Sequence, residues 1–232
     1  MPTTFDAERA TAYDLGLRRV FGDGRARLDL TLYQTDVDDY QALTNSPPVS
    51  PVAPPLRDRL VNVGKVRLRG VELEGALRAS TRLDLRLGLA WSEARYRSFR
   101  EAPCAPEVRS WACDRSGERL YGAPEWSLVS GADYHRPLVR GLEGFAGLDY
   151  RYRSAYQMTL EGGPGSTQDA EGLVDARLGV RRPDGGWEVM LWGRNLFDRP
   201  VLEAVYGRLG AGDYGAIAGD PRTLGVTLRA RY

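Results

Sequence analysis

Apolar and polar residues alternate along most of this 232-residue chain. The alternation is clearest in residues 26–36, 82–91, 173–182 and 223–232, which read ARLDLTLYQTD, RLDLRLGLAW, LVDARLGVRR and TLGVTLRARY. Successive side chains of a β-strand point to opposite faces, so each segment would have one apolar face and one polar face with arginine and aspartate. No segment sustains the 3.6-residue period of an amphipathic helix. The pattern predicts an all-β protein.

The connections between the expected strands alternate in length. Short connections rich in turn residues occupy residues 21–24, 79–82, 135–141 and 182–186. Longer connections occupy residues 44–58, about 101–119, about 159–170 and about 198–221. A β-sandwich gives no reason for this separation, whereas outer-membrane barrels have short periplasmic turns and longer extracellular loops. We therefore predict the antiparallel, up-and-down architecture of a transmembrane β-barrel, with about nine strands.

Strand length and the aromatic residues agree with this prediction. Residues 59–78 and 83–100 are far longer than the roughly five or six residues of a usual globular strand. Several aromatic residues lie near strand ends, where they would form the interfacial girdles of a barrel. They are Trp91, Trp126, Tyr134, Tyr150, Tyr152, Trp187 and Tyr232. The alternative is that they are β-forming residues of a soluble core.

The alternation changes phase within one expected strand. In VNVGKVRLRGVELEG, Val66 and Leu68 share one parity, while Val71 and Leu73 share the other. An inserted residue shifts the register of a strand and would restore the facing of its side chains. We therefore predict a β-bulge near the Arg69–Gly70 step.

The composition limits the classes of function. Acidic and basic residues nearly balance, with a formal net charge of +1, so the basic surface that nucleic acid requires is not indicated. No apolar run approaches the roughly 18 residues of a transmembrane helix. The first residues, MPTTFDAERATAYDLGL, lack a charged region followed by an apolar one, so no signal peptide is expected. The chain is expected to be either cytoplasmic or the back part of a longer protein.

Motifs that suggest chemistry fail on their context. GAGDYG at residues 210–215 matches the dinucleotide pattern GxGxxG, but no helical segment follows it. DVDDY at residues 36–40 begins like a calcium loop, but Pro47 stands where an EF-hand has glutamate. The only histidine, His135, lies in a short turn without a nucleophile motif. We expect no enzyme activity, no catalytic residue, no metal site and no cofactor.

Two cysteines, Cys104 and Cys113, lie nine residues apart in EAPCAPEVRSWACDRSGERL. The absence of a CxxC motif and the single histidine argue against a zinc site. A disulfide between the cysteines suits an oxidising compartment, whereas two free thiols suit a cytoplasmic loop. We predict the disulfide on the condition that the protein is exported.

Four segments together resemble TonB-dependent outer-membrane receptors. Residues 62–78, NVGKVRLRGVELEGALR, resemble a strand in which Asn and Gly lead into G-V-E-x-E. Residues 121–137, YGAPEWSLVSGADYHRP, resemble a strand in which a proline precedes the descent to the periplasm. Residues 187–201, WEVMLWGRNLFDRPV, resemble the penultimate strand, and TLGVTLRARY resembles the closing strand with its terminal aromatic, Tyr232. The segments follow the family's order over residues 62–232.

The resemblance implies that residues 1–232 are the C-terminal portion of the barrel, the last nine of about 22 strands. Family members also have a signal peptide, a plug domain and a TonB box, which are absent from this sequence. TonB would therefore act only through the missing N-terminal part. Other expected partners are outer-membrane lipid, an iron chelate or similar ligand, and the barrel-assembly machinery, which would recognise the closing strand and Tyr232. The expected location is the cell outer membrane of a Gram-negative bacterium.

The function that the resemblance implies is TonB-dependent uptake of a scarce nutrient such as a ferric siderophore. Extracellular loops would capture the ligand, with Tyr206 and Tyr214 as candidate contacts. Arginines of the lumen face suit anionic iron chelates, unless they pair structurally with Asp and Glu. Two alternatives stay open, a small TonB-independent barrel of the porin or adhesin kind and a soluble β-sandwich binding module. Because nine strands leave two open edges, residues 1–232 alone are expected neither to insert stably nor to transport.

Overall fold

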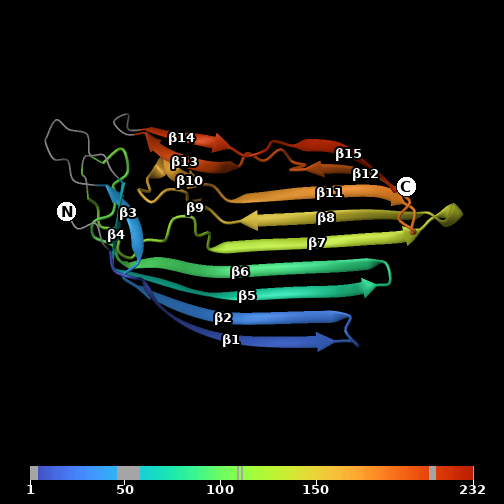
Figure 1. Ribbon diagram of the computed structural model, residues 1–232, viewed down its shortest axis with the longest axis horizontal. Helices are drawn as coiled ribbons and strands as arrows, with labels where there is room; N and C mark the ends of the chain where they lie inside the picture. The colour runs from blue at the N-terminus through green and yellow to red at the C-terminus, as the bar shows by residue number, and fades with distance from the viewer. Residues whose placement is uncertain (1–4, 46–57, 109, 111, 209–212, 232) are drawn as a thin grey trace.

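Nine long strands form one curved antiparallel sheet (Figure 1). The structure, a computed structural model, describes residues 5–45, 58–108, 110, 112–208 and 213–231. In sheet order the strands are β1 (Arg9–Phe21), β2 (Ala26–Asp38), β5 (Lys65–Ser80), β6 (Leu83–Ser98), β7 (Trp126–Pro137), β8 (Glu143–Arg153), β11 (Glu171–Arg181), β12 (Trp187–Arg194) and β15 (Thr223–Ala230). The prediction of an all-β antiparallel fold with about nine strands is confirmed.

The connections between these strands are short at one end of the sheet and long at the other (Figure 1). The short ones are residues 22–25, 81–82, 138–142 and 182–186, the third containing the 3-10 turn η1 (Val139–Gly141). The long ones are residues 39–64, 99–125, 154–170 and 195–222. The predicted alternation of loop length is therefore confirmed. We call the two ends of the sheet the turn end and the loop end.

Three of the four long loops contain a small pair of strands. They are β3 (Gln41–Asn45) with β4 (Asp58–Asn62), β9 (Tyr156–Gln157) with β10 (Thr167–Gln168), and β13 (Leu202–Arg208) with β14 (Asp213–Ala218). A 3-10 turn, η2 (Pro164–Ser166), precedes β10. No helix in the described part of the chain is long and apolar enough to cross a membrane. The loop end is thus built from hairpins and irregular segments.

Cross-strand register divides the sheet into two faces. Residues that pair directly lie on the same face, and one such row joins Leu30, Leu73, Leu89 and Leu128. We call the face that contains this row the apolar face. The adjacent row joins Thr31, Glu72, Ala90 and Ser127 and belongs to what we call the polar face.

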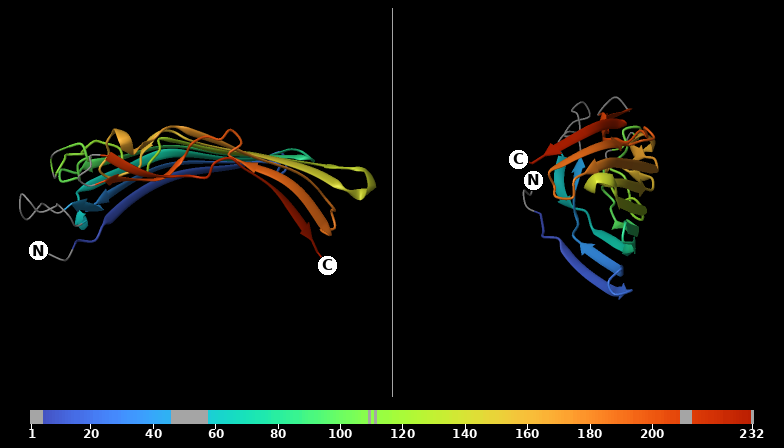
Figure 2. Two further views of the ribbon diagram at one scale, coloured as in Figure 1. Left: turned by 90° about the horizontal axis from the view of Figure 1, so that it is seen from above. Right: turned by 90° about the vertical axis from the view of Figure 1, so that its right-hand side faces the viewer.

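The apolar face is open to its surroundings. In the row that crosses β11, β12 and β15, Leu178, Leu191 and Val226 are 61%, 55% and 61% exposed. A β-sandwich would cover such a face with a second sheet. Within the described residues the sheet is a single curved layer, and its edge strands β1 and β15 do not pair with each other (Figure 2).

Aromatic residues bound the apolar face at both ends. Trp91 pairs with Trp126 at the loop end, and Tyr134 pairs with Leu83 at the turn end. Trp126 and Tyr134 are eight residues apart, which is about 26 Å along a strand. With a strand tilt of about 40°, this length covers about 20 Å of the roughly 25 Å apolar band of an outer-membrane barrel. The other predicted girdle residues in the described part also lie on this face, namely Tyr150, Tyr152 and Trp187.

The predicted β-bulge near Arg69–Gly70 is wrong. Pairing between β2 and β5 runs without a shift, and the pairing of β5 with β6 shifts only near the two ends of β5. Val66 lies on the polar face, where it is 1% exposed and packs in a small core under the loops with Tyr96 and Phe99. The apolar residues change parity because loops cover the polar face at this level, so the strand needs no inserted residue.

Candidate ligand-binding surface

Four charged residues of neighbouring strands form a closed network on the polar face. Arg86 and Arg177 each contact both Asp133 and Asp149. The Arg86 Nη2–Asp149 Oδ1 distance is 2.9 Å, and the Arg177 Nη1–Asp149 Oδ2 distance is 2.7 Å. We call this network the ion-pair quartet. Its two positive and two negative charges balance, so these arginines are already engaged by carboxylates.

Glycine makes room for the quartet. Gly131 lies beneath the Arg86 guanidinium and Gly147 beneath the Arg177 guanidinium, and a Cβ atom at either position would overlap the arginine. Each arginine can therefore lie flat across a strand that has no side chain at that point. This arrangement explains why glycine interrupts both strands despite its weak preference for the strand interior.

Further arginines of the polar face have carboxylate partners. Arg151 Nη2 lies 3.1 Å from Asp175 Oδ2, and Arg153 Nε lies 2.7 Å from Glu171 Oε1. Cross-strand pairs of opposite charge stabilise a sheet. The structural role that the sequence left open for these arginines is therefore present. Anion binding on this face would have to rely on a cation that the sheet does not already pair.

A polar cavity of about 840 Å³ opens on this face near the loop end. Its walls come from the ends of β8, β11 and β12 and from the base of the β13–β14 hairpin. Tyr156 and Asn195 line the cavity together with three arginines and three carboxylates, which are Arg151, Arg153, Arg194, Asp175, Glu203 and Asp220. The Arg194 guanidinium stacks 5.3 Å from the Trp192 ring centroid, and among the described ion pairs it has none. Arg194 is therefore the best-placed cation of this cavity for an anionic group.

Asn195, in the motif GRNLFDRP, shapes one wall of the cavity. Its side-chain amide donates to the carbonyl oxygens of Arg199 and Asp220, at 2.9 Å and 3.3 Å, and accepts from the Arg199 backbone N–H. The nearby Asp198 Oδ1 accepts from the Arg222 backbone N–H at 2.9 Å. These bonds join the start and the end of the long loop 195–222. The motif is thus a clamp that positions the β13–β14 hairpin.

The two candidate tyrosines lie on that hairpin in different environments. The Tyr214 hydroxyl donates to the Gly162 carbonyl oxygen at 2.8 Å and lies 3.2 Å from Glu107 Oε2, so it ties three loops together. Burial, with the Glu107 carboxylate beside it, raises the pKa of Tyr214 to about 12. Tyr206 is 54% exposed and pairs across the hairpin with Gly215. Of the two rings, that of Tyr206 is the more accessible.

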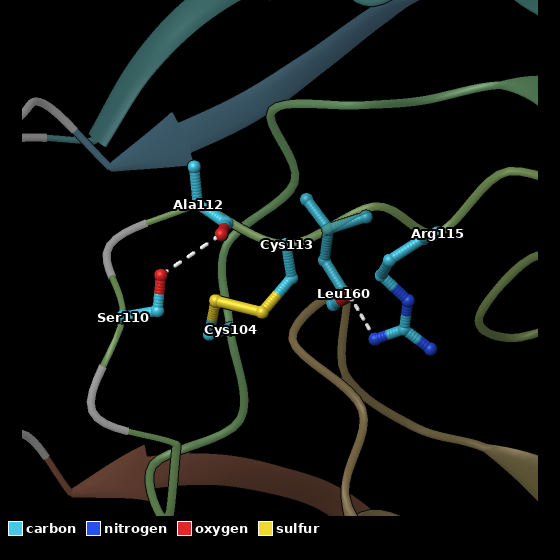
Figure 3. Close-up of a disulfide and its surroundings, with 6 residues drawn as sticks. All are labelled: Cys104, Ser110, Ala112, Cys113, Arg115 and Leu160. Carbon is cyan, nitrogen blue, oxygen red and sulfur yellow. Dashed lines mark hydrogen bonds between the residues drawn. A yellow bond between two sulfur atoms is a disulfide. The ribbon is translucent and has the colours of Figure 1, made fainter.

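A disulfide holds one of these loops. Cys104 and Cys113 are bonded, and their Cα atoms are 5.3 Å apart (Figure 3). Beside the bridge, Arg115 Nη1 donates to the Leu160 carbonyl oxygen at 2.7 Å, which joins the loop 99–125 to the loop 154–170. Together with Tyr214, this contact makes one connected assembly of three loops. We call the assembly the loop lock.

The remaining predicted positions show no reactive arrangement. Asp36 and Asp38 form ion pairs with Arg67 and Lys65, at 2.6 Å in both cases. The described residues contain no group of three or more His, Cys, Asp or Glu side chains that would hold a metal ion. Tyr232, the predicted assembly signal, and residues 210–212 of the GAGDYG motif lie outside the described residues.

Sequence reasoning missed most of the cavity. Arg151 and Arg153 were visible as alternating positions of one strand, but their carboxylate partners come from β11 and need the register to be known. Arg194 lies within the segment 187–201 that resembles the family, but the segment alone did not distinguish it from the other arginines. Tyr156 carried no signal, because the loop that holds it shows no regular pattern.

Residues 2–196 match the family described as TonB dependent receptor-like, beta-barrel. The chain belongs to this family, which confirms the resemblance seen in the sequence. The chain is also 28% identical over 221 residues to the ferric-pyoverdine M114 receptor PbuA of Pseudomonas sp. strain M114. That match covers 95% of this chain but 24% of the relative, so the chain spans about a quarter of the relative's length.

Solved structures share the fold. The ferric yersiniabactin uptake receptor FyuA of Yersinia pestis superposes with a TM-score of 0.74 at 19% identity, over 96% of this chain and 30% of FyuA. The ferripyoverdine receptor of the Pseudomonas aeruginosa outer membrane gives a TM-score of 0.65 at 18% identity, over 96% and 27% of the two chains. The nine strands therefore correspond to part of the wall of such barrels.

Proposed function

We propose that this chain forms part of the barrel wall of an outer-membrane receptor that takes up a scarce nutrient such as a ferric siderophore. The apolar face would contact lipid, and the polar face would line the lumen. The aromatic residues at both ends of the apolar face and the siderophore receptors among its relatives support this orientation. The loop end would lie outside the cell and the turn end in the periplasm.

The proposed role is binding and passage of a ligand, with no chemical step in this chain. Energy would come from TonB through a segment outside these residues, in a longer receptor of which this chain is the C-terminal part. The barrel-assembly machinery would recognise the closing strand and Tyr232. An isolated sheet with two open edges exposes unpaired backbone groups, which are costly in lipid. The remaining strands of the receptor would pair these edges.

One observation carries the proposal about the ligand: the cavity beside Arg194. Most other arginines of the polar face are paired with carboxylates, whereas Arg194 has no ion pair among the described residues. Arg153 also stacks on the Tyr156 ring, at 5.4 Å from its centroid, which presents an aromatic surface beside the cations. A ferric chelate with a net negative charge fits this combination of charge and flat surface.

Uptake of radioactive iron tests the proposal. In cells whose only iron receptor contains this chain, Arg194→Gln should reduce uptake of an anionic ferric chelate about tenfold, because one charge-assisted contact is lost. Arg100→Gln, a matched change of an exposed arginine elsewhere at the loop end, should leave uptake unchanged. Uptake that persists without TonB would instead favour a small passive barrel.

A further inference from the structure

A row of arginines lies on the apolar face beyond its aromatic border. Arg69 pairs with Glu93 two residues beyond the Val71–Trp91 pair towards the loop end, and Arg67 pairs with Arg95 four residues beyond it. Together with Arg97 these side chains line one small cavity of about 70 Å³. We call Arg67, Arg69, Arg95 and Arg97 the outer arginine row.

The outer arginine row has more positive than negative charge. Glu93 accepts from both Arg69 and Arg95, at 2.6 Å and 2.8 Å. Asp36 is the carboxylate partner of Arg67 at 2.6 Å. Four guanidinium groups therefore share two carboxylates, which leaves an excess of two positive charges. This differs from the ion-pair quartet, in which the charges balance.

The pairing of like charges makes this excess costly in the sheet. Two arginines directly opposite each other on neighbouring strands repel, which destabilises the pair. Arg95 is held in place by a second contact, because its Nη1 donates to the Gly117 carbonyl oxygen at 2.8 Å. Arg97 is exposed and has no ion pair among the described residues. The outer arginine row thus has excess positive charge that an anion could neutralise.

The position of the row identifies the kind of anion. Arg69 lies two residues, or about 7 Å, beyond Val71 and its partner Trp91, the level at which lipid headgroups meet an aromatic girdle. On the same face, an apolar cavity of about 570 Å³ is lined by Leu28, Gly75 and Leu87, among others. Gly75 is about 20 Å along β5 from Arg69, comparable to the roughly 15 Å depth of one leaflet's hydrocarbon.

We propose that the outer arginine row binds the phosphate of an outer-leaflet lipid whose acyl chain lies along the apolar face towards the cavity at Gly75. The guanidinium fork suits phosphate oxygens, which accept two parallel hydrogen bonds. The lipid phosphate would balance the excess positive charge that Glu93 and Asp36 do not neutralise. This inference rests on the proposed function in one respect, because it needs the apolar face to lie in lipid.

Binding of a phosphorylated lipid by a receptor that contains this chain, purified in dodecyl maltoside micelles, tests the inference. The probe is lipid A with both phosphates, and the comparison is dephosphorylated lipid A. The intact protein should prefer the phosphorylated lipid. Arg97→Gln should weaken its binding about fivefold and Arg69→Gln with Arg97→Gln about 25-fold, since each arginine contributes separately near a charged surface. High salt should reduce the preference.

A matched control removes arginines from the same face at the turn end. Arg19 and Arg136 share the parity of the apolar face, and Arg19→Gln with Arg136→Gln should keep the preference intact. Heat-modifiable migration should be the same for all variants, which separates lost binding from lost folding. Equal binding of the two lipids, or an equal effect of the control, would overturn the inference. If the unchanged receptor takes up no ferric chelate but still prefers the phosphorylated lipid, only the proposed function would be overturned.

Discussion

The ion-pair quartet joins strands of the sheet, whereas the loop lock joins three loops at one end of it. In the quartet, Arg86, Asp133, Asp149 and Arg177 come from strands that are neighbours in the sheet, so register alone brings them together. In the loop lock, Tyr214 reaches a carboxylate 107 residues away in a different loop. The comparison shows that the sheet is specified strand by strand, whereas the loop end depends on loops that fold onto one another.

Removal of the disulfide should have the largest effect and should act only on the loop lock. Replacing Cys104 and Cys113 by serine frees a short loop, and we expect a loss of about 3 kcal/mol in the free energy that holds this loop closed. Hydrogen exchange of the amides in residues 99–125 measures it. Exchange in β7 and β8 should not change. Faster exchange throughout the sheet would show that the two regions are not independent.

Breaking the quartet should have an intermediate effect that spreads along the sheet. Arg177→Met leaves Asp133 and Asp149 with one arginine, and all three side chains are about a third exposed. We expect unfolding to become easier by about 2 kcal/mol, between the values for exposed and buried pairs.

The control for the quartet is an exposed single pair on the same face. Arg229 is 69% exposed and lies 3.3 Å from Glu188. Arg229→Met should cost less than about 0.5 kcal/mol. Denaturant midpoints of a receptor that contains this chain, measured in micelles, report both changes. Equal midpoints for the two variants would mean that the closed network adds nothing to a simple ion pair.

Loss of one hydroxyl should have the smallest effect and should depend on pH. Tyr214→Phe removes the bond to the Gly162 carbonyl oxygen, and we expect the loops to open more easily by about 1 kcal/mol. The pKa of Tyr214 is raised from 10.0 to about 12 in the folded protein, so the protonated form stabilises the lock. This stabilisation is complete below pH 10 and is lost as the pH rises towards 12.

Hydrogen exchange of residues 154–170 between pH 9 and pH 12, compared with the intrinsic exchange rate, measures this dependence, with about a tenfold faster loop opening expected at the upper end. The Tyr214→Phe variant should lack this increase in loop opening between pH 9 and pH 12. Tyr206→Phe, on the same hairpin but 54% exposed, should behave like the unchanged protein. A step of the same size in the Tyr214→Phe variant would assign the titration to another group.

The sequence predicted most of the sheet correctly, and the wrong predictions concern positions where loops cover the sheet. Leu85, Leu87 and Leu89 were placed on one face by alternation alone, because a strand has a period of two residues. Val66 broke the pattern, since the core under the loops reverses which face is apolar at that level. The sequence did not identify Arg194 as a binding residue. This residue differs from most other arginines of the polar face in having no carboxylate partner among the described residues, and such partners depend on the register between strands.

The amino-acid sequence by itself determined the two faces, the alternation of short and long connections and the family, through the motif around Asn195. These features depend on local periodicity and turn chemistry, which neighbouring residues decide. Only the tertiary structure decided which arginines are neutralised and which have unmatched charge. Pairing of Arg177 with Asp133, and the excess charge of the outer arginine row, arise between strands whose relative register no single segment contains. The sequence thus defines the wall, and the fold defines the charges available for binding.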